Sequence, residues 1–270
     1  MLDNCENCYA GGLCKLTAPT SRNDSGSDSD SDNSSFVTFY RWGTPDKQVT
    51  KVQIREPFED AASRFKQSIV TLKSHIYTKR SQNQHYKEIK ESLNFGQILV
   101  HVDYAESYKN SQQNEIQSAY FGNSTFSIFT ACCYTKPYGD DKMKKDSVVV
   151  ISESKEHDCA AAISCLKKVV EKVEDINETS YNKVFVWING CAAQFRSRFV
   201  FRLITENLFM GADLVWNYNE KSHGKGPIDG VGGTVKSIVF RKVQSGFTTI
   251  HTPLEFHQAV KKFVPSIHSV

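Results

Sequence analysis

Residues 98–104, with the sequence ILVHVDY, decide the fold class of this chain. Apolar side chains fill four of the first five positions, and a short apolar run of this kind is typical of a buried strand. A second strand is predicted at residues 126–134, where Phe, Ile, Thr, Cys and Tyr occupy alternate positions. Short apolar runs predict three more strands, at residues 148–151, 184–188 and 214–218.

Helical spacing separates the later strands. Apolar residues three and four apart predict helices over residues 159–173, 195–203 and 231–239, and Thr252-Pro253-Leu254-Glu255 is a capping box that opens a terminal helix. From residue 96 the expected order is β-β-β-α-β-α-β-α. We expect an α/β mixed sheet with an antiparallel meander followed by parallel crossovers. This is the order of an RNase H-like core; the alternative is a doubly wound α/β domain with an antiparallel edge.

The preceding residues divide into three segments. Residues 1–20 are Cys-rich, and residues 21–35 (SRNDSGSDSDSDNSS) predict a disordered acidic linker, because they hold almost no apolar surface to bury. Residues 36–95 are predicted to be a helical segment, with an apolar stripe from Phe58 to Leu72 and a break near residues 81–84. The core is expected at 96–250 and a C-terminal helix at 251–270.

Composition narrows the function classes. The 270 residues carry 33 Lys+Arg and 30 Asp+Glu; residues 21–35 have net charge −3, so the remainder carries +6. This mildly basic remainder is compatible with a polyanionic partner. The longest apolar runs hold about five residues, against the ~18–20 that cross a bilayer, and residues 1–20 show no signal peptide. We expect an intracellular protein without a membrane partner, with its eight cysteines reduced.

Cys5, Cys8 and Cys14 have half the pattern of a zinc site. A structural Zn²⁺ site needs four ligands, and no His or further Cys lies nearby. Zinc binding here is therefore the weaker of two interpretations; unliganded thiols are the other.

Four polar residues follow predicted strands. Asp103 ends the first strand with Glu106 just beyond, Asn189 ends the fourth, and Asp229 follows the fifth as a candidate helix N-cap. Function in open α/β sheets gathers at the carboxyl ends of strands, and carboxylates meeting there suit Mg²⁺ or Mn²⁺. Turn and helix caps are the structural alternatives, and Asn189-Gly190 is also a hairpin signal.

A family resemblance adds to this reading. The chain resembles transposase-derived proteins with an RNase H-like, DDE-type integrase core in three runs: HVDYAESYKNSQQNEIQSAYFG (101–122), WINGCAAQFRSRFVF (187–201) and WNYNEKSHGKGPIDGVGGTVK (216–236). The resemblance implies DNA strand cleavage and transfer at a two-metal site, in the nucleus, with no small-molecule substrate. It places the first acid at Asp103, the third at Asp229 with Glu106 as another contributor, and Asn189 where the second acid normally stands.

The amide at Asn189 predicts a degenerate site. An amide oxygen is a neutral, weaker ligand than a carboxylate, and losing one charge from a two-metal cluster costs on the order of 10³-fold in rate or more. We therefore expect feeble or absent strand transfer.

Basic side chains near these positions are candidates for nucleic-acid contacts. His223 and Lys225 lie in a Gly-rich loop that matches neither phosphate-binding glycine motif, so backbone contacts to nucleic acid fit better than nucleotide binding. Arg196, Arg198 and Arg202 follow the fourth strand, and the last two share a helix face. Solvated helix faces and a tight turn are the alternatives.

Three functional interpretations follow. The first is a transposase-derived core with impaired phosphoryl transfer. The second is a domesticated, non-enzymatic DNA- or protein-binding module, and the third is an RNase H-like nuclease acting on single strands. The oligomeric state is left open.

Overall fold

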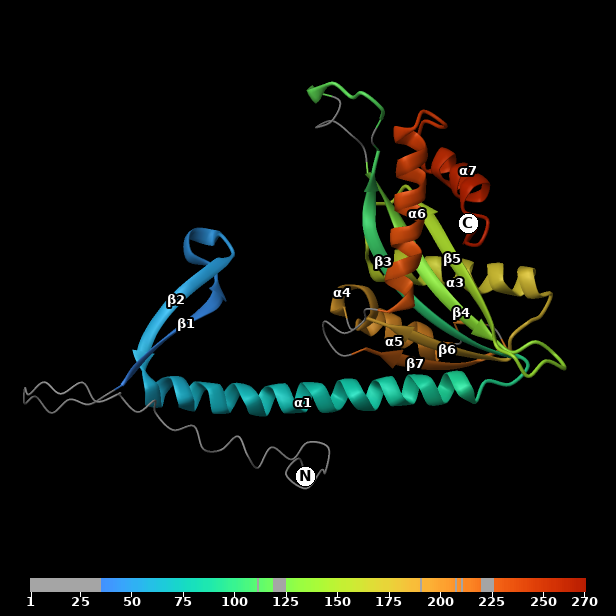
Figure 1. Cartoon of the computed structure of the whole chain (residues 1–270). Coiled ribbons are helices and arrows are strands. Elements are labelled where there is room, and N and C mark those ends of the chain that lie inside the picture. Colours follow the sequence, from blue (N-terminus) through green and yellow to red (C-terminus); the bar gives the residue numbers. More distant parts are fainter. Residues whose placement is uncertain are drawn as a thin grey trace, which may run out of the picture. The chain divides into compact units, whose positions relative to one another are not determined.

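The computed structural model describes residues 35–110, 112–118, 125–189, 191–206, 208–209, 211–219 and 226–270 (Figure 1). The chain divides into two compact units, residues 1–80 and residues 81–270. The cysteines at 1–20 and the predicted linker up to residue 34 lie outside the described residues. Within the described part, no helix is long and apolar enough to span a membrane.

The first unit contains a β-hairpin that the sequence reading missed. Strands β1 (Phe36–Gly43) and β2 (Thr50–Pro57) pair antiparallel, joined by the 3₁₀ turn η1 (Pro45–Lys47), so the helical segment predicted at 36–95 is wrong over its first third. Aromatic and β-branched residues fill six of the eight positions of β1 and alternate positions of β2 from Thr50 to Ile54, and both residue types favour strands. Helix α1 (Phe58–Glu91) then runs without the predicted break, because it contains neither Gly nor Pro.

The second unit is built on a six-stranded mixed sheet. Its strands run in the order β7-β6-β3-β4-β5-β8, with bounds β3 (Gln97–Lys109), β4 (Thr125–Thr135), β5 (Lys144–Ser152), β6 (Lys183–Ile188), β7 (Asp213–Tyr218) and β8 (His268–Ser269). Strands β3, β4 and β5 form an antiparallel meander, while β6 and β7 run parallel to β3 and to each other. The predicted α/β class and mixed sheet are confirmed. Since β6 and β7 are parallel, no hairpin turn forms after Asn189.

Helices cover both faces of this sheet (Figure 1). On one face lie α3 (Cys159–Asn177), α4 (Ala192–Phe195) and α5 (Arg198–Thr205); on the other lie α6 (Pro227–Gln244) and α7 (Pro253–Phe263). The single helix predicted at 195–203 is two short helices. The C-terminal helix predicted at 251–270 ends at Phe263, and β8 then adds to the sheet beside β5.

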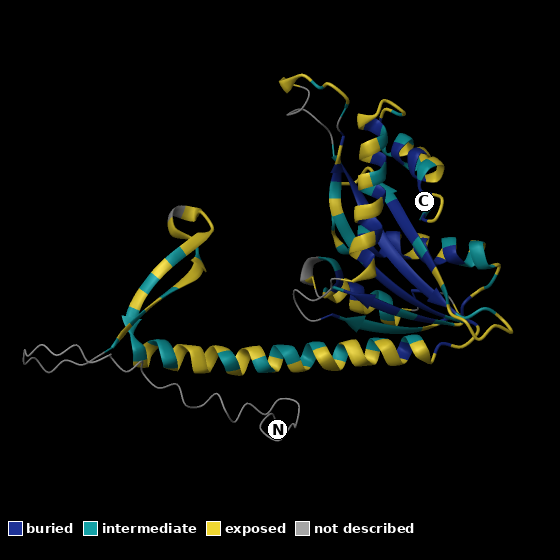
Figure 2. Ribbon diagram, viewed as in Figure 1, coloured by how far each residue is buried: buried dark blue, intermediate teal, exposed yellow. Residues whose placement is uncertain are grey.

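The central strands of the six-stranded sheet are largely buried, whereas the outer faces of the helices that cover the sheet are exposed (Figure 2). Ile98, Val100 and Val102 of β3 pack under α3, whereas Leu99 packs under α6, so alternate β3 residues supply the two halves of the core. Cys132, Cys133 and Cys165 are buried in this core as free cysteines.

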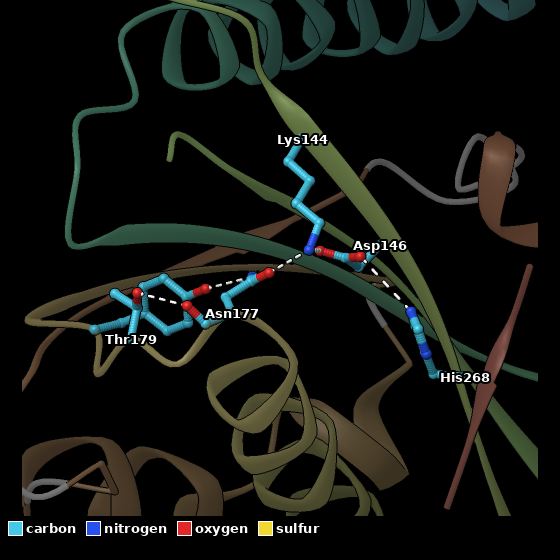
Figure 3. A network of polar contacts seen from close by, with 6 residues as sticks. Lys144, Asp146, Asn177, Thr179 and His268 are labelled. Carbon is cyan, nitrogen blue, oxygen red and sulfur yellow. Dashed lines mark hydrogen bonds and ion pairs between the residues drawn. The ribbon is translucent and has the colours of Figure 1, made fainter. Parts of the chain in front are cut away.

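A polar network holds the last strand and the end of α3 to β5 (Figure 3). The buried carboxylate of Asp146 lies 3.5 Å from Lys144 Nζ and 3.7 Å from His268 Nε2. Lys144 Nζ also donates to the side chain of Asn177, and Thr179 Oγ1 donates to the Asn177 carbonyl. Because these side chains bind one another, the network stabilises the packing of β8 and of the C-terminal end of α3 against β5.

Helix α6 approaches the sheet more closely than a side chain at Gly232 would permit. A Cβ added there would lie 2.8 Å from Ala105 Cβ on β3 and 3.3 Å from Thr130 Cγ2 on β4. At Gly230, by contrast, an added Cβ meets nothing within 4 Å. Gly232 therefore sets how near the start of α6 comes to β3.

We expect Gly232→Ala to destabilise the protein by up to about 2 kcal/mol, because an overpacking cost of roughly 1–3 kcal/mol outweighs the ~1 kcal/mol gain in helix propensity. Gly230→Ala is the matched control and should be neutral or stabilising by about 0.5–1 kcal/mol. Urea unfolding of the two variants checks this. Equal effects from both substitutions would contradict the close packing.

Candidate functional site

Asp103 and Asn189 lie side by side where β3 and β6 stop pairing. Val102 and Ile188 are the last partners of the parallel pair, so the next residue on each strand is Asp103 and Asn189. Asn189 Nδ2 donates a hydrogen bond of 2.5 Å to Asp103 Oδ2. The prediction that Asp103 ends its strand is wrong: β3 continues to Lys109, paired with β4 through a bulge.

Asp229 joins these two residues from α6. The helix begins at Pro227, so Asp229 is its third residue and not the N-cap that was predicted. Its Oδ2 accepts a 3.0 Å hydrogen bond from the backbone N–H of Gly226, which fixes the carboxylate at the helix start. Asp103 and Asp229 line one hollow of about 210 Å³.

Burial raises the pKa of Asp103 from 3.8 to about 6, and the negative charge of Asp229 adds to this rise. Two hydrogen bonds act in the opposite direction, one from the Tyr104 N–H at 2.9 Å and one from Asn189. The Asp103 carboxylate is therefore partly desolvated and lies near a second negative charge. Under these conditions a nearby cation would stabilise its ionised form.

Lys236 supplies a positive charge at the rim of the hollow. Its Nζ lies 3.3 Å from Glu106 Oε2 and donates to the Glu106 carbonyl at 3.1 Å. Glu106, predicted as a further metal ligand, is exposed and paired with this lysine on α6. The sequence reading missed Lys236; its position seven residues after Asp229 on the same helix was the available signal.

A buried aromatic cluster supports the site from one side. His101 is 7% exposed, with Nε2 3.4 Å from Asn219 Nδ2, and the Asn219 side-chain oxygen accepts from the Trp187 indole. The ring of Tyr86 lies edge-on to both His101 and Trp187. Burial lowers the pKa of His101 to about 4, so this histidine is neutral at pH 7 and serves in packing.

None of the five basic residues predicted to contact nucleic acid is placed beside Asp103: three lie near or on α5, and two lie outside the described residues. His223 and Lys225 fall in the latter group. Arg196 stacks over the Tyr218 ring at 4.4 Å, while Arg198 and Arg202 are exposed on α5, which packs on the sheet face opposite α6. Arg202 also pairs with Glu206 at 2.7 Å. Hence the structure does not bring Arg198 and Arg202 to the side of Asp103.

The donor set at the site fits one divalent cation better than two. Asp103 and Asp229 offer carboxylate oxygens and Asn189 an amide oxygen, and Mg²⁺ typically uses one or two carboxylates plus waters. Among the described residues, no group of three or more His, Cys, Asp or Glu side chains could hold a metal ion.

Fold and site together define an α/β protein in which a carboxylate of the mixed sheet, an amide at the end of the neighbouring parallel strand and a carboxylate from a covering helix come together. The chain belongs to the family described as a domain of unknown function, DUF8701, which matches residues 82–270. No curated protein matches the chain. The family match covers almost all of the second unit, including Asp103, Asn189 and Asp229.

We expect Asp103→Asn to raise the free energy of unfolding at pH 7.5 by about 1–3 kcal/mol, because it removes a charge that is costly to bury. Folded Asp103 holds its proton up to about pH 6 and the unfolded chain only to about 3.8, so its charge lowers stability as pH rises through this window. The gain in the variant should vanish toward pH 4.

Denaturant unfolding at several pH values measures this difference. Asp141→Asn is the control, because the Asp141 carboxylate is fully exposed and forms a surface ion pair of 3.8 Å with Lys136, so that its removal should change stability little. A destabilised Asp103→Asn variant at pH 7.5 would contradict the electrostatic picture of the site.

Proposed function

We propose that this protein is a transposase-derived, RNase H-like core that binds DNA and retains a weakened cation site, with DNA strand cleavage strongly impaired. The nucleus is the compartment that goes with this proposal. Its support comes from the sheet topology, from the juxtaposition of three residues distant in sequence, and from the resemblance of the motifs around them.

The topology supports an RNase H-like assignment. An antiparallel three-strand meander with two parallel strands added beside its first strand, each reached through helices, is what the element order led us to expect. Because one fold hosts many functions, this likeness supports the class of protein, and the activity must be argued from the site.

The observation that carries the proposal is the 2.5 Å hydrogen bond from Asn189 Nδ2 to Asp103 Oδ2, beside Asp229. In the resemblance, Asn189 takes the position of an acid that would share a cation with Asp103. The amide nitrogen instead gives Asp103 a neutral partner, which offsets part of its charge without a metal.

Asp103 and Asp229 would hold a Mg²⁺ or Mn²⁺ ion, and rotation of the Asn189 amide would present its oxygen as a third ligand. Bound there, the ion would polarise a phosphodiester and lower the pKa of a water. Asp103 would orient the ion from β3, and Asp229 from α6. Replacing one carboxylate by an amide leaves less charge to stabilise the transition state, at a cost on the order of 10³-fold.

A second candidate is a DNA- or protein-binding module without catalysis. The specific observation in its favour is that polar partners already engage the site: Asn189 binds Asp103, the Gly226 N–H binds Asp229, and Lys236 binds Glu106. A site satisfied in this way can persist without a metal.

We expect Asn189→Asp to bind Mn²⁺ at least tenfold more tightly than the wild type and to gain metal-dependent nicking of supercoiled DNA. The added carboxylate supplies the missing negative charge. Mn²⁺ binding is measured by calorimetry and nicking on gels, with Asn189→Ala as the control that removes the amide without adding charge.

Three outcomes discriminate the candidates. Robust cleavage by the wild type would refute the impairment. Mn²⁺ binding without nicking by Asn189→Asp would favour the non-enzymatic module, and failure of that variant both to bind Mn²⁺ and to nick would refute the acidic site itself.

A further inference from the structure

The hairpin of the first unit displays aromatic rings on its outward face. Phe36, Tyr40 and Trp42 are 53%, 64% and 67% exposed, although alternate residues of β1 share a face and an outer face is normally polar. A cluster of large exposed rings on a short element marks an interaction surface.

Basic side chains from β2 lie beside these rings on the same face of the hairpin. The register pairs Trp42 with Lys51 and Thr38 with Arg55; Lys51 Nζ lies 5.7 Å from the Trp42 ring centroid, and Arg55 Cζ 5.3 Å from that of Phe36. We call this surface the aromatic–basic face, made of Phe36, Thr38, Tyr40, Trp42, Lys51, Gln53 and Arg55.

The aromatic–basic face carries two cations and no acid. The strand residue Glu56 belongs to the other face, where its carboxylate binds Arg64 at 2.5 Å, and the apolar side chains there are half-buried. The other face carries the cation Arg41 as well as the acid Glu56, so among the strand residues only the acid is confined to one face. Two cations without an acid favour a polyanion on this face over a basic or purely apolar partner.

We propose that the aromatic–basic face binds single-stranded nucleic acid. Bases stack on exposed rings irrespective of sequence, and nearby Lys and Arg side chains contact the phosphates, which is how sequence-tolerant single-strand binding works. Tyr40 and Trp42 are two residues apart on one strand, about 7 Å, so successive bases can each meet a ring. The paired bases of a duplex are stacked inward and do not offer their faces to the rings.

This surface lies in a different unit from Asp103 and Asn189 and does not rest on the proposed activity of that site. It also lies outside residues 82–270, which the family match covers. Binding to the face is therefore testable while the acidic site stays intact.

The test is fluorescence anisotropy of the full chain with labelled oligothymidine and oligouridine of about 12 nucleotides, a length within the range of known single-strand sites. We expect binding to at least one of them and weaker binding to a duplex. Trp42→Ala and Tyr40→Ala should each weaken binding about tenfold. Replacing Lys51 and Arg55 by Gln should lower the salt dependence of binding.

Phe247→Ala is the matched control, because Phe247 is also 67% exposed and has Lys242 Nζ 4.7 Å from its ring, but lies in the second unit. It should bind both oligonucleotides as the wild type does. Preference for DNA or RNA between the two probes identifies the natural strand.

Absence of binding to both oligonucleotides would overturn the proposal, as would equal losses from Phe247→Ala and Trp42→Ala. Sedimentation velocity tests the alternative that a second copy of the chain binds the aromatic–basic face. A wild-type dimer that Trp42→Ala dissociates, with no oligonucleotide binding, would assign the face to a second copy of the chain. Melting curves of the variants should match the wild type, since the replaced side chains are exposed.

Discussion

Strand β3 is paired along both edges and covered on both faces, and this constraint shapes the rest of the second unit. A strand so enclosed must be apolar, and residues 98–100 and 102 are. Asp103 breaks the pattern at the first position beyond the β6 pairing. A carboxylate in such surroundings needs a hydrogen-bond donor or a cation to offset the cost of burying its charge. Asn189 donates a hydrogen bond to Asp103, whereas the negative charge of Asp229 raises that cost.

The approach of α6 to β3 makes this site a single unit. Gly232 lets the helix lie against Ala105 and Thr130, which brings Asp229, one helical turn earlier, to the Asp103 side of the sheet. The same helix presents Lys236 at the rim. This packing contact therefore positions one carboxylate and one ammonium beside Asp103 and Asn189, and the proposed cation site depends on it.

Much of this arrangement could be predicted from the sequence, because strand ends are marked by local pattern. The adjacency of Asp103 and Asn189 follows from two apolar runs that each give way to a polar residue, because these runs pair in parallel up to Val102 and Ile188, although β3 itself continues to Lys109. Periodicity does not encode how α6 docks, which decides the place of Asp229 and the pairing of Glu106 with Lys236. It also does not encode the contacts of Asn219 with Trp187 and His101, which arise across the sheet. The hairpin at 36–57 was missed because the helical stripe beginning at Phe58 was extended backwards over it.

The pKa of Asp103 tests the account most directly, because it depends on the burial of the carboxylate, on the hydrogen bond from Asn189 and on the charge of Asp229. NMR titration of the labelled side chain should give a pKa near 6 without metal, well above the usual 3.8, and a marked decrease once Mg²⁺ is added. An ordinary pKa in the absence of metal, unchanged by Mg²⁺, would mean that Asp103 is a solvated residue and that no cation site exists beside Asn189.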